Sequence, residues 1–185
     1  IDLVFPHHEN EIAQAEAATK KQFARYWLHG EHLVISGQKM AKALKNIFTL
    51  RDVELEHFTP VAFRYLVLGA HYRSPLNFTW ESLSAAQNSL ESLYDFVQEL
   101  RNKKNMQKKA SSLQNFKKQF EEAMGDDLST PKALATLWEL VHEYHKHPDA
   151  YHTKSILVLL FSWDTILGLG LKETHAISIP TNIKN

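Results

Sequence analysis

The chain has 185 residues, 44% of them hydrophobic, which is enough for one domain or two small ones around a packed core. Its 21 Lys and Arg residues balance 21 Asp and Glu residues, so net charge gives no global reason to expect nucleic-acid binding. Cysteine is absent, which excludes disulfides, thiol catalysis and thiolate metal ligands, and no apolar run is long enough to span a bilayer. We therefore expect a cytoplasmic protein that makes no membrane contact.

Ionisable side chains cluster near the start, in the run Phe5-Pro6-His7-His8-Glu9-Asn10-Glu11. Pro6 suits the first turn of a helix, where its missing N–H is not needed. In such a helix His7, rather than His8, stands a full turn from Glu11 on the same face. An imidazole and a carboxylate at this spacing suit a shared zinc ion. A capped, solvated first turn explains the same residues and, from spacing alone, is the commoner case.

Short elements of mixed type are expected as far as about residue 77. Apolar periodicity, proline positions and turn residues indicate each of them. In chain order we expect a helix over 12–19, a strand over 32–35, a turn over 36–38, a helix from a Thr49 cap to Leu55, a mostly buried helix over 61–71 opened by Pro60, and a loop over 74–77.

From Thr79 onward the pattern is helical. The first long helix carries an apolar stripe at alternating three- and four-residue steps: Leu83, Ala86, Leu90, Leu93, Val97 and Leu100. A lysine-rich connector follows over 101–109. Three more helices are expected over about 113–124, from Thr130 and Pro131 to 144, and over 156–167. Four helices with short links predict an up-and-down, antiparallel bundle.

A second chemical signal is the run Lys39-Met40-Ala41-Lys42-Ala43, which follows the predicted strand and turn. Lysines on a loop can reach a polyphosphate and offset charge that builds up during group transfer. A solvated basic loop explains the same residues and, for an isolated Lys-x-x-Lys, is by far the commoner case.

Several segments, taken in order, resemble the cysteinyl-tRNA synthetases, a family of class I aminoacyl-tRNA synthetases. Residues 2–11 resemble the zinc-site signature of that family. Further similar segments follow at fitting distances, over 26–29, 39–46, 71–77, 124–127 and 130–131. One such segment is a weak signal, but several in the right order across nearly the whole chain are a strong one.

The resemblance implies a mainly α fold with three parts. Residues 1–30 would end a class I, Rossmann-like nucleotide-binding α/β domain, 31–78 would form a connector with the lysine loop, and 79–185 an incomplete antiparallel helical bundle. The implied reaction uses ATP, with Mg²⁺, to convert cysteine to cysteinyl-adenylate and then esterifies the tRNA for cysteine. Zinc in this family binds the substrate thiolate, which discriminates against the hydroxyl of serine.

Residue roles follow from the same resemblance. His7 and Glu11 match two zinc ligands, the remaining ligands lying outside this chain. Asp2 matches an acidic residue that hydrogen-bonds the ribose of ATP. Lys39 to Ala43 match the KMSKS loop, in which Lys42 stabilises the pyrophosphate leaving group and Lys39 is a supporting cation.

Two departures from the family bear on activity. Ala41 and Ala43 replace the two serines of KMSKS. The HIGH motif lies outside the chain, which we interpret as an internal piece of a longer protein that is inactive alone. Two alternatives stay open: a non-catalytic paralogue that binds tRNA or a protein partner, and a relative that joins cysteine to an amino sugar. In that relative the histidine pair is not usually followed by Asn-Glu, so Glu11 argues against it.

Overall fold

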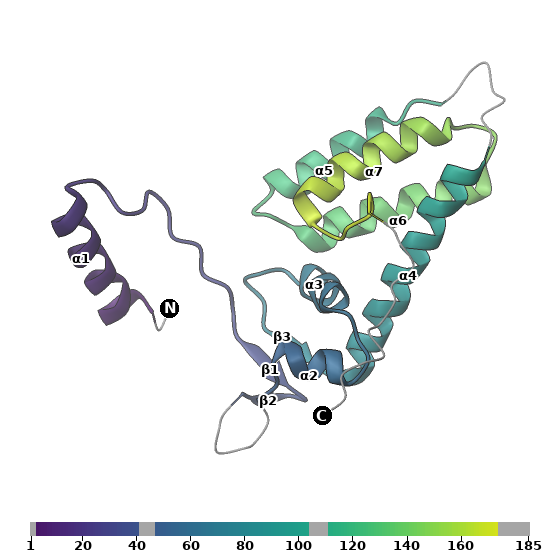
Figure 1. Cartoon of the computed structure of the whole chain (residues 1–185). Coiled ribbons are helices and arrows are strands. Elements are labelled where there is room, and N and C mark those ends of the chain that lie inside the picture. The colour runs from purple at the N-terminus through teal and green to yellow at the C-terminus, as the bar shows by residue number, and fades with distance from the viewer. Residues whose placement is uncertain (1–2, 41–46, 104–110, 174–185) are drawn as a thin grey trace.

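The computed structural model describes residues 3–40, 47–103 and 111–173. The chain is mainly helical, with one small sheet (Figure 1). No helix among the described residues is long and apolar enough to cross a membrane. Its elements are η1 (Val4–His8, a π-helical turn), α1 (Glu9–Thr19), β1 (Leu33–Ile35), β2 (Gln38–Lys39), α2 (Leu50–Leu55), α3 (Pro60–Leu68), β3 (Leu76–Phe78), α4 (Trp80–Asn102), α5 (Gln114–Gly125), α6 (Thr130–Lys146) and α7 (Thr153–Leu167).

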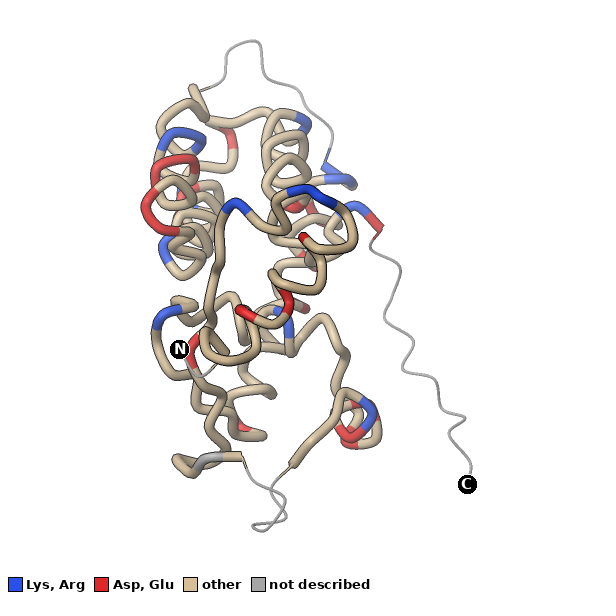
Figure 2. The backbone as a smooth tube through the Cα atoms, turned by 90° about the vertical axis from the view of Figure 1, so that its left-hand side faces the viewer, with Lys and Arg blue, Asp and Glu red and all other residues tan. Residues whose placement is uncertain are grey.

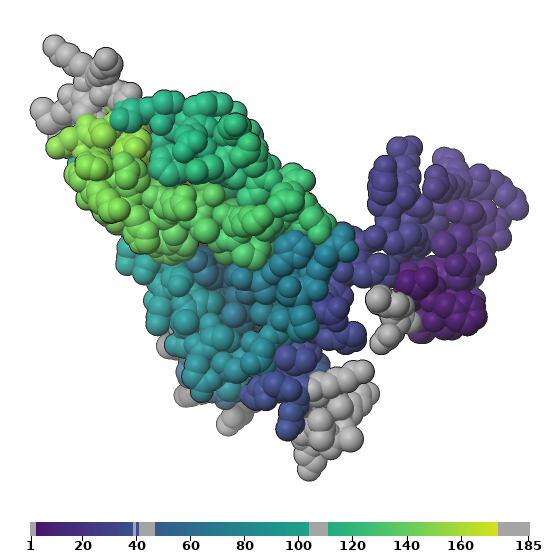
Figure 3. Space-filling model, turned by 180° about the vertical axis from the view of Figure 1, so that it is seen from behind, coloured from purple at the N-terminus to yellow at the C-terminus, as the bar shows by residue number. Residues whose placement is uncertain are grey.

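The N-terminal helix stands apart from the body of the molecule (Figures 1 and 3). A cis peptide joins Phe5 to Pro6 within η1, and α1 follows directly, as the prediction of a helix near Pro6 requires. None of the residues of α1 is buried. Several large apolar side chains around it are exposed, including Phe5 at 78% and Tyr26 at 91%. Burial in the described chain therefore contributes little to the stability of this helix.

The sheet has three strands in the order β2-β1-β3. β1 is the strand expected from the sequence, and it forms an antiparallel hairpin with β2, which was predicted as turn and loop. β1 and β3 are parallel, with Leu33 opposite Leu76. The prediction of a loop over 74–77 was therefore wrong for Leu76 and Asn77. Asn77 also accepts a hydrogen bond from the backbone N–H of Gly37 at 2.8 Å, which fixes the hairpin turn from the third strand.

The short helices begin where the sequence predicts, α2 after the Thr49 cap and α3 at Pro60. Thr49 and Asp52 form a reciprocal capping box at the start of α2. Thr59 caps α3 and Pro60 occupies its first turn, but α3 ends at Leu68, three residues before the predicted end. Each cap satisfies backbone N–H groups that have no partner within the helix, so these starts are locally encoded.

The first long helix carries the predicted apolar face. All six residues of the α4 stripe are buried. The start of α6 differs by one residue from the prediction, because Ser129 rather than Thr130 occupies the N-cap position. α7 ends at Gly168, whose φ of 65° suits a left-handed helix end.

Two apolar cores organise the body. The sheet core consists of Ile35, Val53, Ala62, Phe78 and Leu83, with partly buried aromatic residues around it. The helical core is larger and draws its buried side chains from α4, α5, α6, α7 and the segments after α6 and α7. α3 and α4 contribute to both cores, and α3 lies between the sheet and the other helices in Figure 1.

Charged residues of both signs are dispersed along the helices (Figure 2). On α5, Lys117 pairs with Glu121 and Lys118 with Glu122, each one helical turn apart. Such exposed pairs contribute little to stability but keep the helix surface solvated.

We expect the backbone amides of α1 to exchange with deuterium at least about tenfold faster than those in the middle of α6. The reason is that α1 buries no residue, whereas α6 buries seven. Hydrogen-exchange mass spectrometry measures both helices in one sample, so each serves as the reference for the other. Equal protection of the two helices would contradict this interpretation.

Candidate functional site

The predicted metal-binding pair lies at the junction of η1 and α1. His7 and Glu11 are both exposed. Glu11 Oε2 lies 3.1 Å from Nδ1 of His8, which is three residues away and largely buried. In this structure, then, the described partner of Glu11 is His8. Joint metal binding by His7 and Glu11 stays a prediction.

An aromatic pocket surrounds His8. Its ring packs against Trp27, with centroids 4.0 Å apart, and lies 5.0 Å from the ring of His29. The pocket encloses about 330 Å³ and also contacts Leu3, Leu28, Gly30 and His32. Nε2 of His8 is buried without a hydrogen-bond partner among the described residues. A buried polar atom of this kind is costly, so Nε2 marks a place where a polar group is needed.

The donor chemistry of this segment fits zinc, but the number of donors does not complete a site. Imidazole nitrogen and carboxylate oxygen are accepted zinc ligands, and zinc in proteins takes at least three protein ligands. In the part of the chain that the structure describes, no three His, Cys, Asp or Glu side chains gather closely enough to hold a metal ion. This segment fits half of a zinc centre.

The lysine loop is anchored on the sheet. The backbone of Lys39 belongs to β2 and pairs with Val34 of β1. The turn before it contains Gly37 with φ of 77°, a conformation that favours glycine. Lys42 and Asp2 lie outside the described residues, so the roles expected of these two side chains stay predictions.

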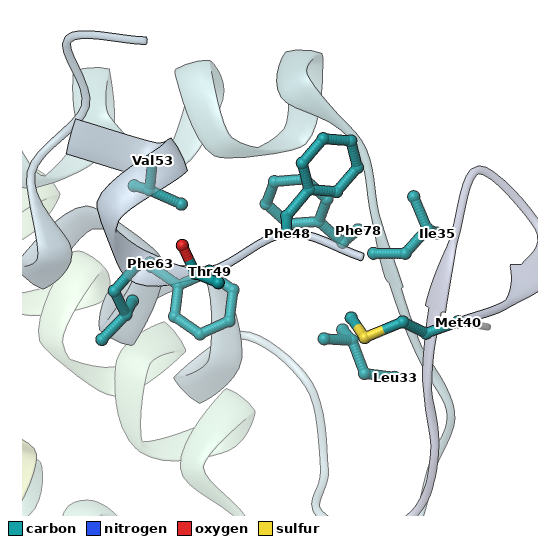
Figure 4. Close-up of a pocket in the computed structure, with 9 residues that line it drawn as sticks. Leu33, Ile35, Met40, Phe48, Thr49, Val53, Phe63 and Phe78 are labelled. Carbon is teal, nitrogen blue, oxygen red and sulfur yellow. The ribbon is translucent and has the colours of Figure 1, made fainter. Parts of the chain in front are cut away.

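An apolar pocket lies against Met40, a described residue of the lysine loop (Figure 4). Met40 and Phe48, which stand on either side of residues 41–46 in the sequence, both line it. The pocket encloses about 130 Å³ and is otherwise lined by residues of β1, α2, α3, β3 and the α2 cap: Leu33, Ile35, Thr49, Leu50, Val53, Phe63 and Phe78. Apolar packing thus holds the described residues at both ends of the loop against the sheet core.

A hydrogen-bonded cluster joins the segment before β3 to the turn between α5 and α6. Asp127 accepts two hydrogen bonds from the guanidinium of Arg73, from Nε at 2.6 Å and from Nη2 at 3.1 Å. The hydroxyl of Tyr72 donates to the same carboxylate at 2.6 Å. His71 Nε2 lies 3.0 Å from the Asp127 carbonyl oxygen, and its Nδ1 accepts from the Arg73 N–H. One aspartate therefore contacts three consecutive residues.

The cluster holds Asp127 ionised. Hydrogen bonds from Arg73 and then from Tyr72 lower the pKa of Asp127 to about 2. Because this pKa lies below its ordinary value, the attraction between the Asp127 carboxylate and Arg73 is present throughout the neutral range and is lost only as pH falls through about 2. In the sequence, residues 125–127 lie between two expected helices, and no contact was predicted for them. The resemblance over 71–77 and 124–127 was the one available signal, and nothing in it paired the two segments.

Comparisons with known proteins cover the chain from end to end. Residues 1–88 match the model of the tRNA synthetases class I (C) catalytic domain, and residues 119–172 match the DALR domain. A cysteine–tRNA ligase of Chlamydia pneumoniae is 42% identical over 99% of this chain. Those of Legionella pneumophila (strain Corby) and Protochlamydia amoebophila are 43% and 38% identical over 97% and 100% of it.

The chain belongs to the cysteinyl-tRNA synthetase family. It spans 40% of the length of each of these three curated relatives. The class I catalytic match ends inside α4, and the DALR match covers most of the α5–α7 region. In these terms, Arg73 lies in the catalytic match and Asp127 in the DALR match, so the hydrogen-bonded cluster joins the two matched regions.

The apolar pocket gives a test of the sheet core. We expect Phe78→Ala to lower the free energy of unfolding by about 3–5 kcal/mol, because Phe78 is only 2% exposed and its removal would enlarge the existing pocket. Urea denaturation measures the change.

Leu50→Ala is the matched control, since Leu50 lines the same pocket but is 53% exposed. It should cost less than about 1 kcal/mol. Similar losses for the two variants would mean that the pocket is not part of a packed core.

Proposed function

We propose that this chain forms part of a cysteine–tRNA ligase. That enzyme would activate cysteine with ATP to give cysteinyl-adenylate and pyrophosphate, and would then transfer the cysteinyl group to the tRNA for cysteine. The observation that carries the proposal is sequence identity of 38–43% to cysteine–tRNA ligases across essentially the whole chain. The order of the two family matches along the chain supports it.

Activation of the amino acid would depend on two segments within the catalytic match, the start at Asp2 and the lysine loop. Asp2 would hydrogen-bond the ribose of ATP. The phosphates of the ATP would carry Mg²⁺. Lys42 would stabilise charge on the departing pyrophosphate, with Lys39 as a supporting cation. Residues Ala41 and Ala43 supply no hydroxyl to this loop, so we expect slower adenylate formation than with serines at these positions.

Zinc would be bound by His7 and Glu11 together with ligands from outside this chain. When bound, zinc would supply a soft-ligand site for the cysteine thiolate. The contribution of the chain itself is to orient the donors. Glu11 contacts His8 at 3.1 Å, and Trp27 packs on the His8 ring, so this local cluster would hold the start of α1 in place.

The three expected parts have distinct proposed tasks. Residues 1–30 would end the nucleotide-binding domain, whose remainder would cover the exposed side chains near Phe5 and Tyr26. Residues 31–78 would carry the lysine loop. Residues 79–185 would form an antiparallel helical bundle that contacts tRNA. We propose that the reaction takes place in the cytoplasm.

One observation favours a second candidate function. The replacement of both loop serines by Ala41 and Ala43 fits a non-catalytic paralogue that binds tRNA or a protein partner. Detection of cysteine-dependent exchange of pyrophosphate into ATP separates the two functions, because a binding protein gives none.

We expect the full-length gene product to catalyse this exchange, and Lys42→Ala to lower its kcat by about 100-fold, since the main electrostatic stabilisation of the leaving group is removed. Lys45→Ala is the control, a neighbouring lysine of the same loop with no assigned role. Equal effects of the two substitutions would show that loop charge in general, rather than Lys42, is responsible.

We also expect the full-length gene product to contain about one zinc ion per chain, measured by elemental analysis, as is typical of a single four-ligand site. His7→Ala and Glu11→Gln should both lose the metal. Glu9→Gln changes an exposed carboxylate of the same turn and should retain it. Loss of zinc from His8→Ala with retention in His7→Ala would reassign the ligand to the histidine that contacts Glu11.

A further inference from the structure

The cluster at Asp127 combines a bidentate ion pair, a hydroxyl donor and a contact between a guanidinium and an aromatic ring. The Arg73 guanidinium donates two hydrogen bonds to one carboxylate, and the same guanidinium lies over the Tyr72 ring, 5.0 Å from its centroid. The Tyr72 hydroxyl completes the carboxylate shell at 2.6 Å. A bidentate contact fixes both the distance and the relative orientation of the guanidinium and the carboxylate, and a single-point ion pair fixes only the distance.

The backbone on both sides of the cluster is also constrained. Asp127 and Leu128 both have φ of 53°, a left-handed conformation that non-glycine residues adopt at a cost. The His71 ring is hydrogen-bonded at both nitrogens, to the Asp127 carbonyl oxygen and to the Arg73 N–H. The turn between α5 and α6 is therefore held by main chain and side chain together.

The position of the cluster determines what it can control. α3 and α4 already join the sheet core to the helical core through apolar contacts. The cluster adds a polar tie at the α5–α6 turn, which Figure 1 shows on the side of α3 away from α4. Contacts on opposite sides of α3 restrict rotation of the helical core relative to the sheet core, whereas apolar packing alone tolerates small shifts.

We propose that Asp127 and Arg73 are positioning residues that set the angle between the helical part of the chain and the sheet that carries the lysine loop. This inference rests on the proposed function. A tRNA bound by the helical part must bring its reactive end to the catalytic part, so the transfer step depends on this angle. Formation of cysteinyl-adenylate involves only the catalytic part and does not.

The test uses the full-length gene product with two assays, cysteine-dependent pyrophosphate exchange and aminoacylation of tRNA. We expect Asp127→Asn to leave exchange within about twofold of the wild-type rate and to raise KM for tRNA by about 5- to 10-fold. Asparagine is chosen because it keeps the side-chain shape and tolerates positive φ, so the backbone of the turn is preserved.

Asp126→Asn is the matched control. Asp126 is the adjacent aspartate, and it pairs with Lys132 of α6 at 2.8 Å, entirely within the helical part. This variant should behave as wild type in both assays. Arg73→Ala should reproduce the effect of Asp127→Asn, and the double variant should be no worse than either single variant, since both remove the same contact.

Three results would overturn the proposal. An unchanged KM for tRNA in Asp127→Asn would show that the contact has no positioning role. An equal fall in exchange and aminoacylation would show a general structural role. Additive effects of the two substitutions would show that the residues act separately. Failure of the proposed function is distinct, because the wild-type protein would then show no exchange at all.

Discussion

The structure depends on the sharing of α3 between two apolar cores. Ala62, Phe63 and Leu66 face the sheet core, while Val61, Tyr65 and Leu68 pack against the helical core. A nine-residue helix with apolar side chains on opposite faces has little stability of its own, so α3 depends on packing against both cores. The hydrogen bond from Trp138 Nε1 to the Tyr65 hydroxyl, at 2.7 Å, adds a directional contact on the helical side.

This arrangement makes the catalytic match and the DALR match one structural unit in the described chain. The lysine loop is connected to the sheet core through β2, Met40 and Phe48. The sheet core is connected to the helical core through α3 and α4, and the Asp127 cluster adds a polar contact at the edge. The base of the loop and the helical core are therefore joined through a continuous set of packed side chains.

The sequence predicted those features that are encoded locally. The cap at Thr49, the start of α3 at Pro60 and the helix end at Gly168 depend on residues within one turn, and the α4 stripe depends on periodicity alone. β3 was not predicted, because Pro75 is typical of loops and because the strand forms only by pairing with β1, about forty residues away. The contact of Arg73 with Asp127 spans 54 residues and likewise has no local signature. The family was predicted from several short motifs in the right order. The chemistry of the single residues in these motifs left their function ambiguous.

The end of α7 bears on how the two matched regions can evolve. Arg64 of α3 donates from Nε to the carbonyl oxygen of Leu167 at 2.9 Å. A Cβ at Gly168 would stand only 3.0 Å from the same guanidinium, and the positive φ there disfavours other residues as well. Arg64 and Gly168 are thus a matched pair, with one residue in each matched region. Exchange of one region between relatives must keep this pair compatible, in addition to the Arg73–Asp127 and Tyr65–Trp138 contacts.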